Sequence, residues 1–364
     1  MATVLKAGII GCGGIAFGKH MPSIKKVPDV EMVAFCDIVE EKAVTAAKEY
    51  GTADAKVYLD YRKMLEDKAI DIIYVLTPNK DHCEISVAAL EADKHVMCEK
   101  PMAKTYADAK LMYDAYIKAN KRSGKLLTIG YQTRFAPGSQ YLKEACERGD
   151  LGEIYFAKAW ALRRRAVPTW GVFLDEEKQG GGPLVDIGTH ALDLTLWMMN
   201  NYKPKSVMGT LYKKLNDNGV CGNVFGPWDP KEYTVEDSAF GFIIMENGAT
   251  VSLESSWALN TLLYHEATTQ LCGTKGGADT MKGLKFNGDD LGRLYEKTPD
   301  MNGGGVAFFE GGSTTDPATI EAMSFIDAIR KEKLPTVLPE QALVVSQILE
   351  AVYTSGRTGQ LVTF

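Results

Sequence analysis

A carboxylate, an imidazole and a second carboxylate fall at i, i+4 and i+7 in one glycine-rich stretch, as Asp186, His190 and Asp193. In a helix these three side chains share one face. A carboxylate one turn from an imidazole can orient the ring and support its charged form, as a general base near neutral pH requires. The alternatives are a packed structural histidine and a metal pair, but no third ligand is indicated nearby and zinc sites usually need one. We therefore expect Asp186 and His190 to be catalytic and predict no metal site.

A glycine-rich turn near the N-terminus has the spacing of a dinucleotide-binding loop. Gly11, Gly13 and Ala16 give the pattern Gly-x-Gly-x-x-Ala between an apolar run and a helical stretch. The glycines permit a tight turn and let the backbone approach a pyrophosphate, while the small third residue allows helix and strand to pack closely. We expect Gly11, Gly13, Gly14 and Ile15 to contact the cofactor.

The carboxylate of Asp37 follows the second apolar run, 21 residues after Ala16. This is close to the interval of about 20 residues at which nucleotide-binding folds place the acid that holds the ribose hydroxyls. Its charge would repel a 2′-phosphate, and no arginine occupies positions 38–42. The sequence therefore favours NAD over NADP. The alternative is that Asp37 only ends a strand or caps the next helix.

A lysine follows the fifth apolar run, in Cys98-Glu99-Lys100-Pro101. Ligands bind at the carboxyl ends of the strands in doubly wound folds. Lys100 is therefore a candidate catalytic cation, and the alternative is a solvated surface lysine.

Short apolar runs alternate with helical segments through the first 130 residues, and these elements must position the glycine loop, Asp37 and Lys100. Most of the runs are unbroken, which is typical of strands buried on both faces of a parallel sheet. They cover residues 4–10, 30–36, 70–76, 95–98 and 126–129. The pattern predicts an α/β fold in which residues 1–130 form a doubly wound Rossmann domain that binds NAD.

Residues 131–364 show longer, alternating runs, which predict a second, α+β domain with an antiparallel sheet. The runs cover residues 154–162, 206–215, 239–245, 249–257 and 267–272. Asn247-Gly248 lies between two of them and predicts a hairpin, because both residues tolerate positive φ. Residues 217–236 and 286–312 are rich in Gly, Pro, Asn and Asp and predict long loops. Two helices, at 318–331 and 339–354, end the chain, and the pattern leaves their docking open.

The overall composition excludes several classes of protein. The chain has 364 residues and a formal net charge of −6, the wrong sign for a protein that binds the phosphates of nucleic acid. Its apolar runs fall short of the roughly 20 residues that cross a bilayer. Seven scattered cysteines without a Cys-x-x-Cys pair suggest free thiols in a reducing compartment. We expect a cytoplasmic protein with neither nucleic-acid nor membrane partners.

Together the motifs resemble the glucose-fructose oxidoreductase, inositol dehydrogenase and rhizopine catabolism family (Gfo/Idh/MocA). Besides the glycine loop and Asp37, the resemblance rests on Thr77-Pro78-Asn79 with His82, on Glu99-Lys100-Pro101, and on Gly-Gly-Gly-x-Leu-x-Asp-x-Gly-x-His-x-x-Asp at residues 180–193. Order and spacing match over nearly the whole chain. The resemblance implies a Rossmann domain, a C-terminal α+β domain with a large open antiparallel sheet used in homo-oligomers, and NAD(P)-dependent chemistry on sugars or polyols.

The resemblance also implies roles for individual residues. Lys100 matches the family's catalytic lysine, and Asp186 and His190 match the dyad of inositol-dehydrogenase-like members. The tyrosine that relatives of glucose-fructose oxidoreductase place near the histidine is missing here, which favours His190 as the general base. The residues that match cofactor-binding motifs are Thr77, Pro78, Asn79, His82, Glu99 and Lys100.

These roles predict hydride transfer from a secondary alcohol carbon to NAD. We expect His190 to accept the hydroxyl proton and Lys100 to stabilise the negative charge that develops on the oxygen. Asp186 would orient His190 or hold a neighbouring hydroxyl.

The substrate is expected to be a sugar or glycoside, because aromatic rings and fork-shaped donors suit a ring that bears hydroxyls. Residues 163–171 are similar to a segment of a bacterial subgroup that includes glucoside 3-dehydrogenases and C-glycoside oxidases, so the C3 hydroxyl of a glucoside is the expected position. Alternatives are a closed-cycle oxidoreductase that keeps its NAD, a sugar-ketone reductase, an inositol-type dehydrogenase and a dinucleotide-sensing module without catalysis. The candidate substrate contacts are Gln132, Arg134, Arg163, Trp170, Asp186 and His190.

Overall fold

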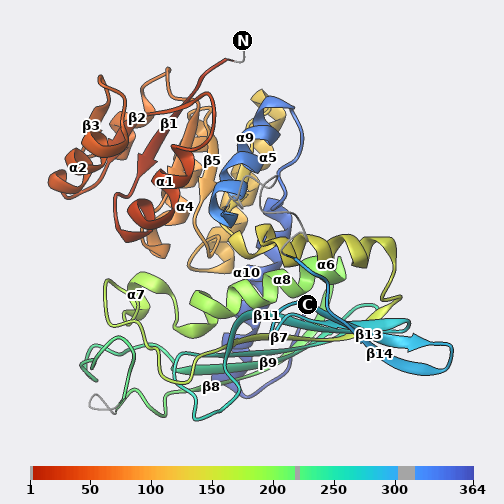
Figure 1. Ribbon diagram of the computed structural model, residues 1–364. Coiled ribbons are helices and arrows are strands. Elements are labelled where there is room, and N and C mark those ends of the chain that lie inside the picture. The colour runs from red at the N-terminus through yellow and green to blue at the C-terminus, as the bar shows by residue number, and fades with distance from the viewer. Residues whose placement is uncertain (1–2, 218–221, 302–315) are drawn as a thin grey trace. The chain divides into compact units, whose positions relative to one another are not determined.

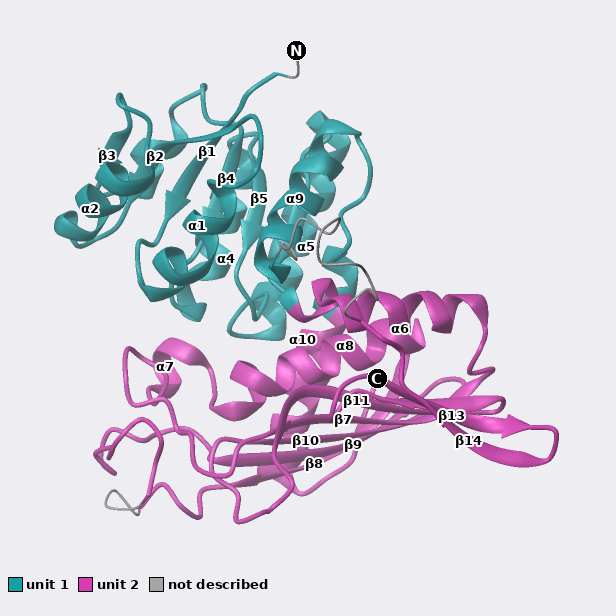
Figure 2. Cartoon of the chain, in the orientation of Figure 1, with its two compact units in different colours: residues 1–132, 315–343 teal, residues 133–314, 344–364 magenta. Residues whose placement is uncertain are grey.

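The computed structural model describes residues 3–217, 222–301 and 316–364. The chain divides into two compact units (Figure 2). Unit 1 comprises residues 1–132 and 315–343, and unit 2 comprises residues 133–314 and 344–364. No helix within the described ranges is both long enough and apolar enough to cross a membrane.

Unit 1 contains a parallel sheet of six strands in the order β3-β2-β1-β4-β5-β6 (Figure 1). The order reverses between β1 and β4, which is the switch point of a doubly wound sheet. The predicted Rossmann fold is therefore confirmed. Only β3 was missed, because this short edge strand is largely exposed and has no apolar run. The strands are β1 (Leu5–Ile10), β2 (Val30–Cys36), β3 (Lys56–Tyr58), β4 (Ile72–Val75), β5 (His95–Cys98) and β6 (Leu127–Ile129).

Helices connect these strands, and local signals set several of their ends. The side chain of Thr105 accepts a hydrogen bond from the N–H of Asp108 and caps α5, which ends at Gly124 with a φ of +67°. The helical elements of unit 1 are the π-helical turn Ala16–His20, α1 (Met21–Ile24), α2 (Glu40–Tyr50), α3 (Tyr61–Leu65), the 3-10 turn Asn79–Asp81, α4 (His82–Glu91), α5 (Tyr106–Ser123) and α9 (Pro317–Arg330).

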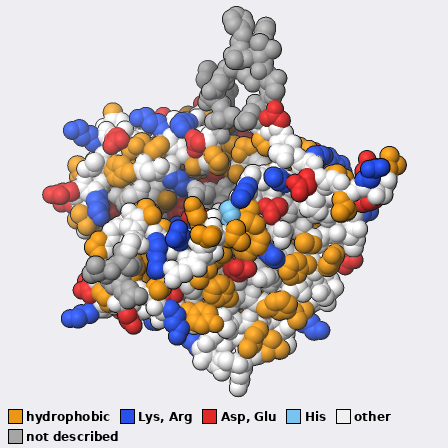
Figure 3. Space-filling view, turned by 60° about the horizontal axis from the view of Figure 1, so that its bottom comes forward, with side chains coloured by type: hydrophobic (Ala, Val, Ile, Leu, Met, Phe, Trp, Pro, Cys, Tyr) orange, Lys and Arg blue, Asp and Glu red, His pale blue; other side chains and the backbone are white. Residues whose placement is uncertain are grey.

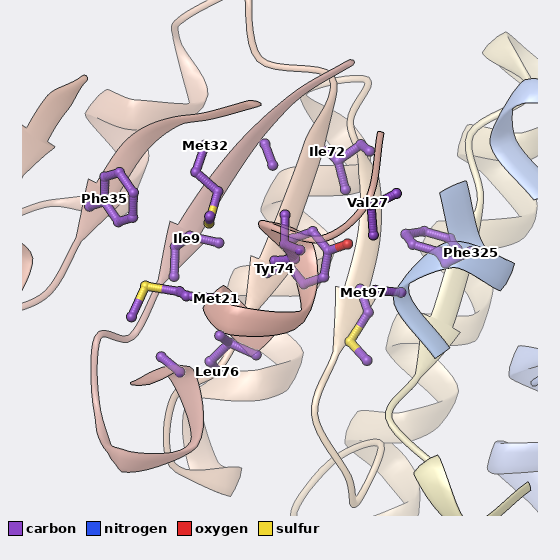
Figure 4. Close-up of a cluster of buried hydrophobic side chains, with 14 of the residues drawn as sticks. Ile9, Met21, Val27, Met32, Phe35, Ile72, Tyr74, Leu76, Met97 and Phe325 are labelled. Atoms are coloured by element: carbon purple, nitrogen blue, oxygen red, sulfur yellow. The ribbon is translucent and has the colours of Figure 1, made fainter. Parts of the chain in front are cut away.

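Helix α9 belongs to unit 1, although the sequence prediction counted residues 318–331 with the C-terminal domain. Phe325 and Ile326 of α9 are 3% and 1% exposed and share one apolar core with Ile9 of β1 and Tyr74 of β4 (Figure 4). Their pattern reveals that the helix buries one face, but not which element covers it. The assignment of α9 is therefore corrected.

Unit 2 contains a sheet of nine strands in the order β14-β13-β12-β11-β7-β10-β9-β8-β15. Its neighbouring strands are antiparallel except for the parallel pair β7 and β10. All five predicted runs are strands. The strands are β7 (Ile154–Leu162), β8 (Pro204–Tyr212), β9 (Ser238–Met245), β10 (Thr250–Ser256), β11 (His265–Gly273), β12 (Gly276–Asp279), β13 (Lys285–Asp290), β14 (Arg293–Lys297) and β15 (Val362–Thr363).

The two predicted loops and the hairpin have different outcomes. Strands β9 and β10 form the predicted hairpin, and Gly248, but not Asn247, has a positive φ. The predicted loop at 286–312 is wrong in its first part, where β13 and β14 pair across Leu291 and Gly292 with φ of +50° and +74°. Every residue of β14 is exposed, so no apolar alternation marks it. Residues 302–312 lie outside the described residues. The described part of 217–236 contains neither helix nor strand.

Helix α8 covers one face of this sheet and packs against β7 and β11 (Figure 1). Its residues Thr189–Met198 are all buried. The helical elements of unit 2 are the 3-10 turn Gln132–Phe135, which begins at the last residue of unit 1, α6 (Pro137–Arg148), α7 (Glu176–Gln179), the π-helical turn Leu184–Gly188, α8 (Thr189–Met199) and α10 (Pro339–Thr358), whose first residues belong to unit 1.

Candidate active site

The turn after β1 requires glycine at its first position. Gly11 has a φ of +93°, and a Cβ added there would lie 2.6 Å from the carbonyl oxygen of Leu76. Any other residue at this position would strain the backbone and clash with the Leu76 carbonyl. This close approach fixes the glycine loop beside the end of β4.

The surface beyond Gly13 and Gly14 is open. A Cβ added to either residue would meet no other protein atom within 4 Å. Ile15 is 43% exposed, whereas Ala16 is fully buried against the sheet. Bare backbone at the start of a helical segment fits the pyrophosphate of a dinucleotide. The loop thus has the form that NAD binding requires.

Asp37 lies beside this loop at the end of β2. Its Oδ2 accepts a hydrogen bond from the N–H of Cys12 at 2.9 Å, and its Oδ1 accepts one from the N–H of Val39 at 2.8 Å. A carboxylate offers about four acceptor sites, so these bonds leave capacity for ribose hydroxyls. The side chain remains partly exposed. Asp37 therefore helps to shape the loop and can still bind a ligand.

His82 ties together two of the recognised motifs. Its ring is 1% exposed, with Nδ1 2.8 Å from the carbonyl oxygen of Pro101 and Nε2 2.9 Å from that of Thr77. Each ring nitrogen lies within hydrogen-bond distance of a backbone carbonyl, so His82 links the two loops, and its contact with the cofactor stays a prediction. Pro78 is exposed, and Thr77 and Asn79 are partly exposed beside it.

Glu99 is the buried neighbour of Lys100. Its Oε1 lies 2.9 Å from Lys19 Nζ and 2.7 Å from His20 Nε2, and its Oε2 accepts a bond from the N–H of Lys100 at 2.9 Å. Burial raises the pKa of Glu99, but Lys19, His20 and Lys100 outweigh it and hold this pKa well below its usual value. Both oxygens of Glu99 are thus bonded inside the protein, with Oε2 holding the backbone of Lys100, and its contact with the cofactor stays a prediction. Lys100 itself is partly exposed.

In unit 2, Asp186 lies in the π-helical turn Leu184–Gly188 and His190 lies in the first turn of α8. Trp257, which is fully buried, donates a hydrogen bond from Nε1 to Asp186 Oδ2 at 3.0 Å. The ring of His190 is 9% exposed. The predicted helix therefore carries both residues, and Trp257 fixes the carboxylate.

A buried carboxylate that sequence reasoning missed holds the start of this helix. Glu236 accepts hydrogen bonds from the N–H groups of Gly182 at 2.9 Å and Leu184 at 3.2 Å, and from the hydroxyl of Tyr353 at 2.8 Å. Burial raises the pKa of Glu236, against the effect of these donors. The partners are far apart in sequence, so no local motif could have identified them.

Arg134 does not fit its predicted role in substrate binding. It is fully buried and binds both carboxylate oxygens of Asp193, at 2.8 and 2.5 Å. Its guanidinium also lies 5.3 Å from the ring centroid of Trp197. This prediction is therefore corrected, since the guanidinium has no surface that a sugar could reach. Asp193, although it shares the helix of Asp186 and His190, belongs to this internal ion pair.

Arg163, the first arginine of its run, forms an ion pair with Glu266. Burial lowers the pKa of Arg163, but Glu266 and, to a smaller extent, Asp186 raise it above its ordinary value. Glu266 accepts from Nε at 2.8 Å and from Nη2 at 2.5 Å. Arg164 is exposed, and Arg165 bonds to Asn260 at 2.8 Å.

Aromatic rings connect the surface of unit 2 with Trp257. Trp170 is 52% exposed and makes edge contacts with Phe225 at 4.6 Å and Phe173 at 5.8 Å between ring centroids. Phe173 in turn lies 6.4 Å from Trp257. Trp170 thus offers an exposed apolar surface, as a sugar-binding residue would. Gln132, the other predicted contact, is partly exposed in the 3-10 turn after β6.

No group of three or more His, Cys, Asp or Glu side chains in the described ranges is placed to hold a metal ion. The six cysteines in those ranges, Cys12, Cys36, Cys83, Cys98, Cys146 and Cys272, are free thiols.

Two family models match the chain. Residues 5–130 match an oxidoreductase family with an NAD-binding Rossmann fold, and residues 139–279 match the GFO/IDH/MocA C-terminal domain. The chain is 37% identical to D-glucoside 3-dehydrogenase of Escherichia coli (strain K12), over 98% of this chain and 96% of that protein. It is 32% identical to inositol 2-dehydrogenase of Salmonella typhimurium, over 56% of this chain and 57% of that protein.

A solved structure shows the same fold over the whole chain. The structure of levoglucosan dehydrogenase in complex with NADH and levoglucosan superposes with a TM-score of 0.82 and covers 99% of both chains. The sequence identity is 23%, so this likeness concerns the fold alone.

Two alanine variants distinguish the structural glycine from the ligand-binding glycine. Gly11→Ala should lower the melting temperature, because the new Cβ would lie 2.6 Å from the carbonyl oxygen of Leu76. Gly13→Ala should leave the melting temperature nearly unchanged but weaken NAD binding by about tenfold or more, equivalent to about 1.4 kcal/mol. Thermal unfolding and titration calorimetry with NAD measure the two effects. A Gly13→Ala variant that binds NAD as tightly as the wild type would contradict this assignment.

Proposed function

The chain belongs to the GFO/IDH/MocA family of NAD-binding oxidoreductases, and we propose that it oxidises a secondary hydroxyl of a sugar or glycoside, with the C3 hydroxyl of a D-glucoside as the first candidate. The observation that carries the proposal is the geometry around Asp186 and His190. Trp257 binds the Asp186 carboxylate, and Glu236 binds the backbone just before it. Such fixed groups are what acid–base catalysis needs. The match to D-glucoside 3-dehydrogenase over nearly the full chain supports the substrate class.

His190 is the proposed general base. An imidazole titrates near neutral pH and can take the hydroxyl proton as the C–H bond breaks. Asp186 would orient His190 or accept a hydrogen bond from a neighbouring hydroxyl of the sugar. Its bond from Trp257 leaves acceptor capacity for either role.

Lys100 is the proposed electrostatic catalyst. When bound, NAD would accept the hydride from the substrate carbon. The ammonium of Lys100 would stabilise the negative charge on the substrate oxygen, and such electrostatic stabilisation often lowers the activation barrier more than any other single effect. Gly11, Gly13, Gly14, Ile15 and Asp37 are proposed to hold the cofactor, together with Thr77, Pro78 and Asn79.

The substrate is proposed to bind to groups of unit 2 near Asp186. Trp170 offers an exposed ring, and sugar rings present apolar C–H faces that pack on such surfaces. Arg163 uses Nη1 and Nη2 for Ala166 and Glu266, which fixes the guanidinium in place. Gln132, the last residue of the first segment of unit 1, is retained as a further proposed contact.

The uncovered face of the unit 2 sheet supports a homo-oligomer. The alternate residues Phe240, Phe242 and Ile244 of β9 face away from the buried side, and Phe242 is 51% exposed. Met208, its partner on β8, is 41% exposed. Figure 3, in which the bottom of Figure 1 comes forward, shows patches of hydrophobic side chains on the exposed surface. Apolar patches of this kind often mark protein interfaces.

The scattered free thiols support the reducing cytoplasm as the proposed location of the protein.

A panel of sugars tests the proposed reaction. Purified protein with added NAD should form NADH with alkyl or aryl D-glucosides, and NMR of the product should locate the carbonyl at C3. Absorbance at the NADH band follows the reaction, with myo-inositol and free glucose as comparison substrates. Heat-denatured protein is also assayed for released NAD(H), because a closed-cycle enzyme would contain it and would need a second sugar. If the protein binds NAD but oxidises no sugar, the proposal is wrong.

Substitution of the two proposed catalytic groups tests their roles. Lys100→Met and His190→Ala should each lower kcat by about 10²-fold or more, on the usual scale for acid–base groups. NAD binding should remain close to that of the wild type. Steady-state kinetics and calorimetry give the two quantities, and Arg164→Ala serves as a control at an exposed arginine. Full turnover in both variants would refute the assignment.

A charge on the open sheet face tests the oligomer. Phe242→Glu should convert the protein to a species of lower mass in light scattering, because a carboxylate would be buried at the interface. Leu111→Glu is the control, since Leu111 is 59% exposed on α5 of unit 1. If both variants and the wild type have the mass of a single chain, the proposed interface does not exist.

A further inference from the structure

A series of buried charges connects α9 with the backbone of Lys100. Lys19 Nζ lies 2.9 Å from Glu321 Oε2 on α9 and 2.9 Å from Glu99 Oε1. The three side chains are between 6% and 9% exposed. Glu99 Oε2 then accepts the N–H of Lys100 at 2.9 Å. Glu321 therefore holds Lys19, Lys19 holds Glu99, and Glu99 holds the backbone of Lys100.

The burial of charged groups is energetically unfavourable, so a role beyond stability would explain why this cluster is present. The removal of ions from water costs several kcal/mol per ion, and apolar residues of similar volume often stabilise a fold equally well or better. The same helix carries a contrasting pair, Lys26 with Asp316 at 2.8 Å, whose side chains are 59% and 45% exposed. That exposed pair already joins the start of α9 to the same segment of the chain. Attachment of α9 alone does not require Glu321.

Lys19 and His20 both lie in the π-helical turn Ala16–His20. Lys19 and His20 are consecutive, yet both contact the same oxygen, Glu99 Oε1. The turn therefore presents two consecutive side chains to one carboxylate, in a π-helical segment rather than a regular α-helix. Such turns are rare and occur frequently at functional sites. The backbone of this segment is thus shaped so that two side chains converge on Glu99.

Charge balance within the cluster also points towards Lys100. Two carboxylates, Glu99 and Glu321, face one ammonium, Lys19. Burial lowers the pKa of Lys19, but Glu321 and Glu99 outweigh it and raise this pKa, so the ammonium stays charged. His20 and Lys100 also lower the pKa of Glu99.

We propose that Lys19 and Glu321 are positioning residues for Lys100, acting through Glu99, so that a helix from the C-terminal part of the chain sets the geometry of the reaction. This inference rests on the proposed function, in which Lys100 is catalytic. Without the charge of Glu321, Lys19 is held from one side only, and Glu99 gains freedom to turn away from the N–H of Lys100. Displacements of about 1 Å can lower rates by about 10²-fold.

The test compares Glu321→Gln with Asp316→Asn, because each removes a carboxylate that pairs with a lysine, Glu321 within α9 and Asp316 at its N-cap. Glu321→Gln should lower kcat by between about 10- and 100-fold. NAD affinity should stay near the wild-type value. With a glucoside deuterated at the reacting carbon, the primary isotope effect on kcat should rise, because hydride transfer becomes slower relative to product release. Glu321→Asp should recover part of kcat. Asp316→Asn should change neither kcat nor the isotope effect, even where it lowers the melting temperature.

A second measurement is independent of turnover. Lysine amines are methylated with ¹³C-formaldehyde and borohydride, and the NMR signal of Lys100 is identified by its loss in Lys100→Arg. This signal should shift in Glu321→Gln and not in Asp316→Asn. If the wild type oxidises no sugar, the proposed function fails, and this comparison alone decides whether Glu321 positions Lys100.

Several results would overturn the inference. These are an unchanged kcat and isotope effect in Glu321→Gln, an equal loss in Asp316→Asn, or an unshifted Lys100 signal. If Glu321→Gln does not fold, Lys19→Arg is tested instead. This variant keeps the positive charge at position 19 but has a wider head group. Lys19→Arg should lower kcat and raise the isotope effect, and wild-type values of both would count against the proposal.

Discussion

Each unit contains a buried carboxylate that binds backbone N–H groups beside a proposed catalytic residue. Glu99 accepts the N–H of Lys100 in unit 1, and Glu236 accepts those of Gly182 and Leu184 in unit 2. A carboxylate in a poorly solvated interior is stable only when its oxygens are bound, and charge-assisted bonds of this kind are strong. Loop and carboxylate therefore stabilise each other. The placement of Lys100 and Asp186 depends on these two buried carboxyl groups.

A π-helical turn accompanies each of these carboxylates. Ala16–His20 brings the side chains of Lys19 and His20 to Glu99, and Leu184–Gly188 carries Asp186 just before α8. A π-helical turn gives up the regular hydrogen bonding of an α-helix, so it persists where the surrounding structure stabilises it. Here the buried ions and the bond from Trp257 supply that support. The irregular backbone and the buried charges are thus parts of one arrangement in each unit.

Sequence reasoning was successful where the controlling contacts are local. The apolar runs of the parallel sheet, the left-handed Gly11 and the hairpin at Gly248 all follow from residues within a few positions of one another. Arg134 and Arg163 look equivalent in the sequence, but Arg134 is fully buried and binds Asp193 of α8. Because Asp193 is 59 positions away in the sequence, no local pattern indicates this ion pair. The roles of Glu236 and Glu321 were missed for the same reason, because their partners lie in distant segments of the chain. Strands β13 and β14 were missed because exposed strands need no apolar alternation.

Hydrogen-bond capacity explains which polar residues of the motifs can still bind a ligand. A polar atom that is buried and already bonded inside the protein has little left to offer to a ligand. Both oxygens of Glu99 and the guanidinium of Arg134 are used in this way, and the buried ring of His82 lies within hydrogen-bond distance of two backbone carbonyls. Asp37 and Asp186 differ, because each is partly exposed and has acceptor capacity beyond its internal bonds. We therefore propose that these motifs contain two kinds of polar residue, those that would contact the ligand and those that hold the contacting residues in place.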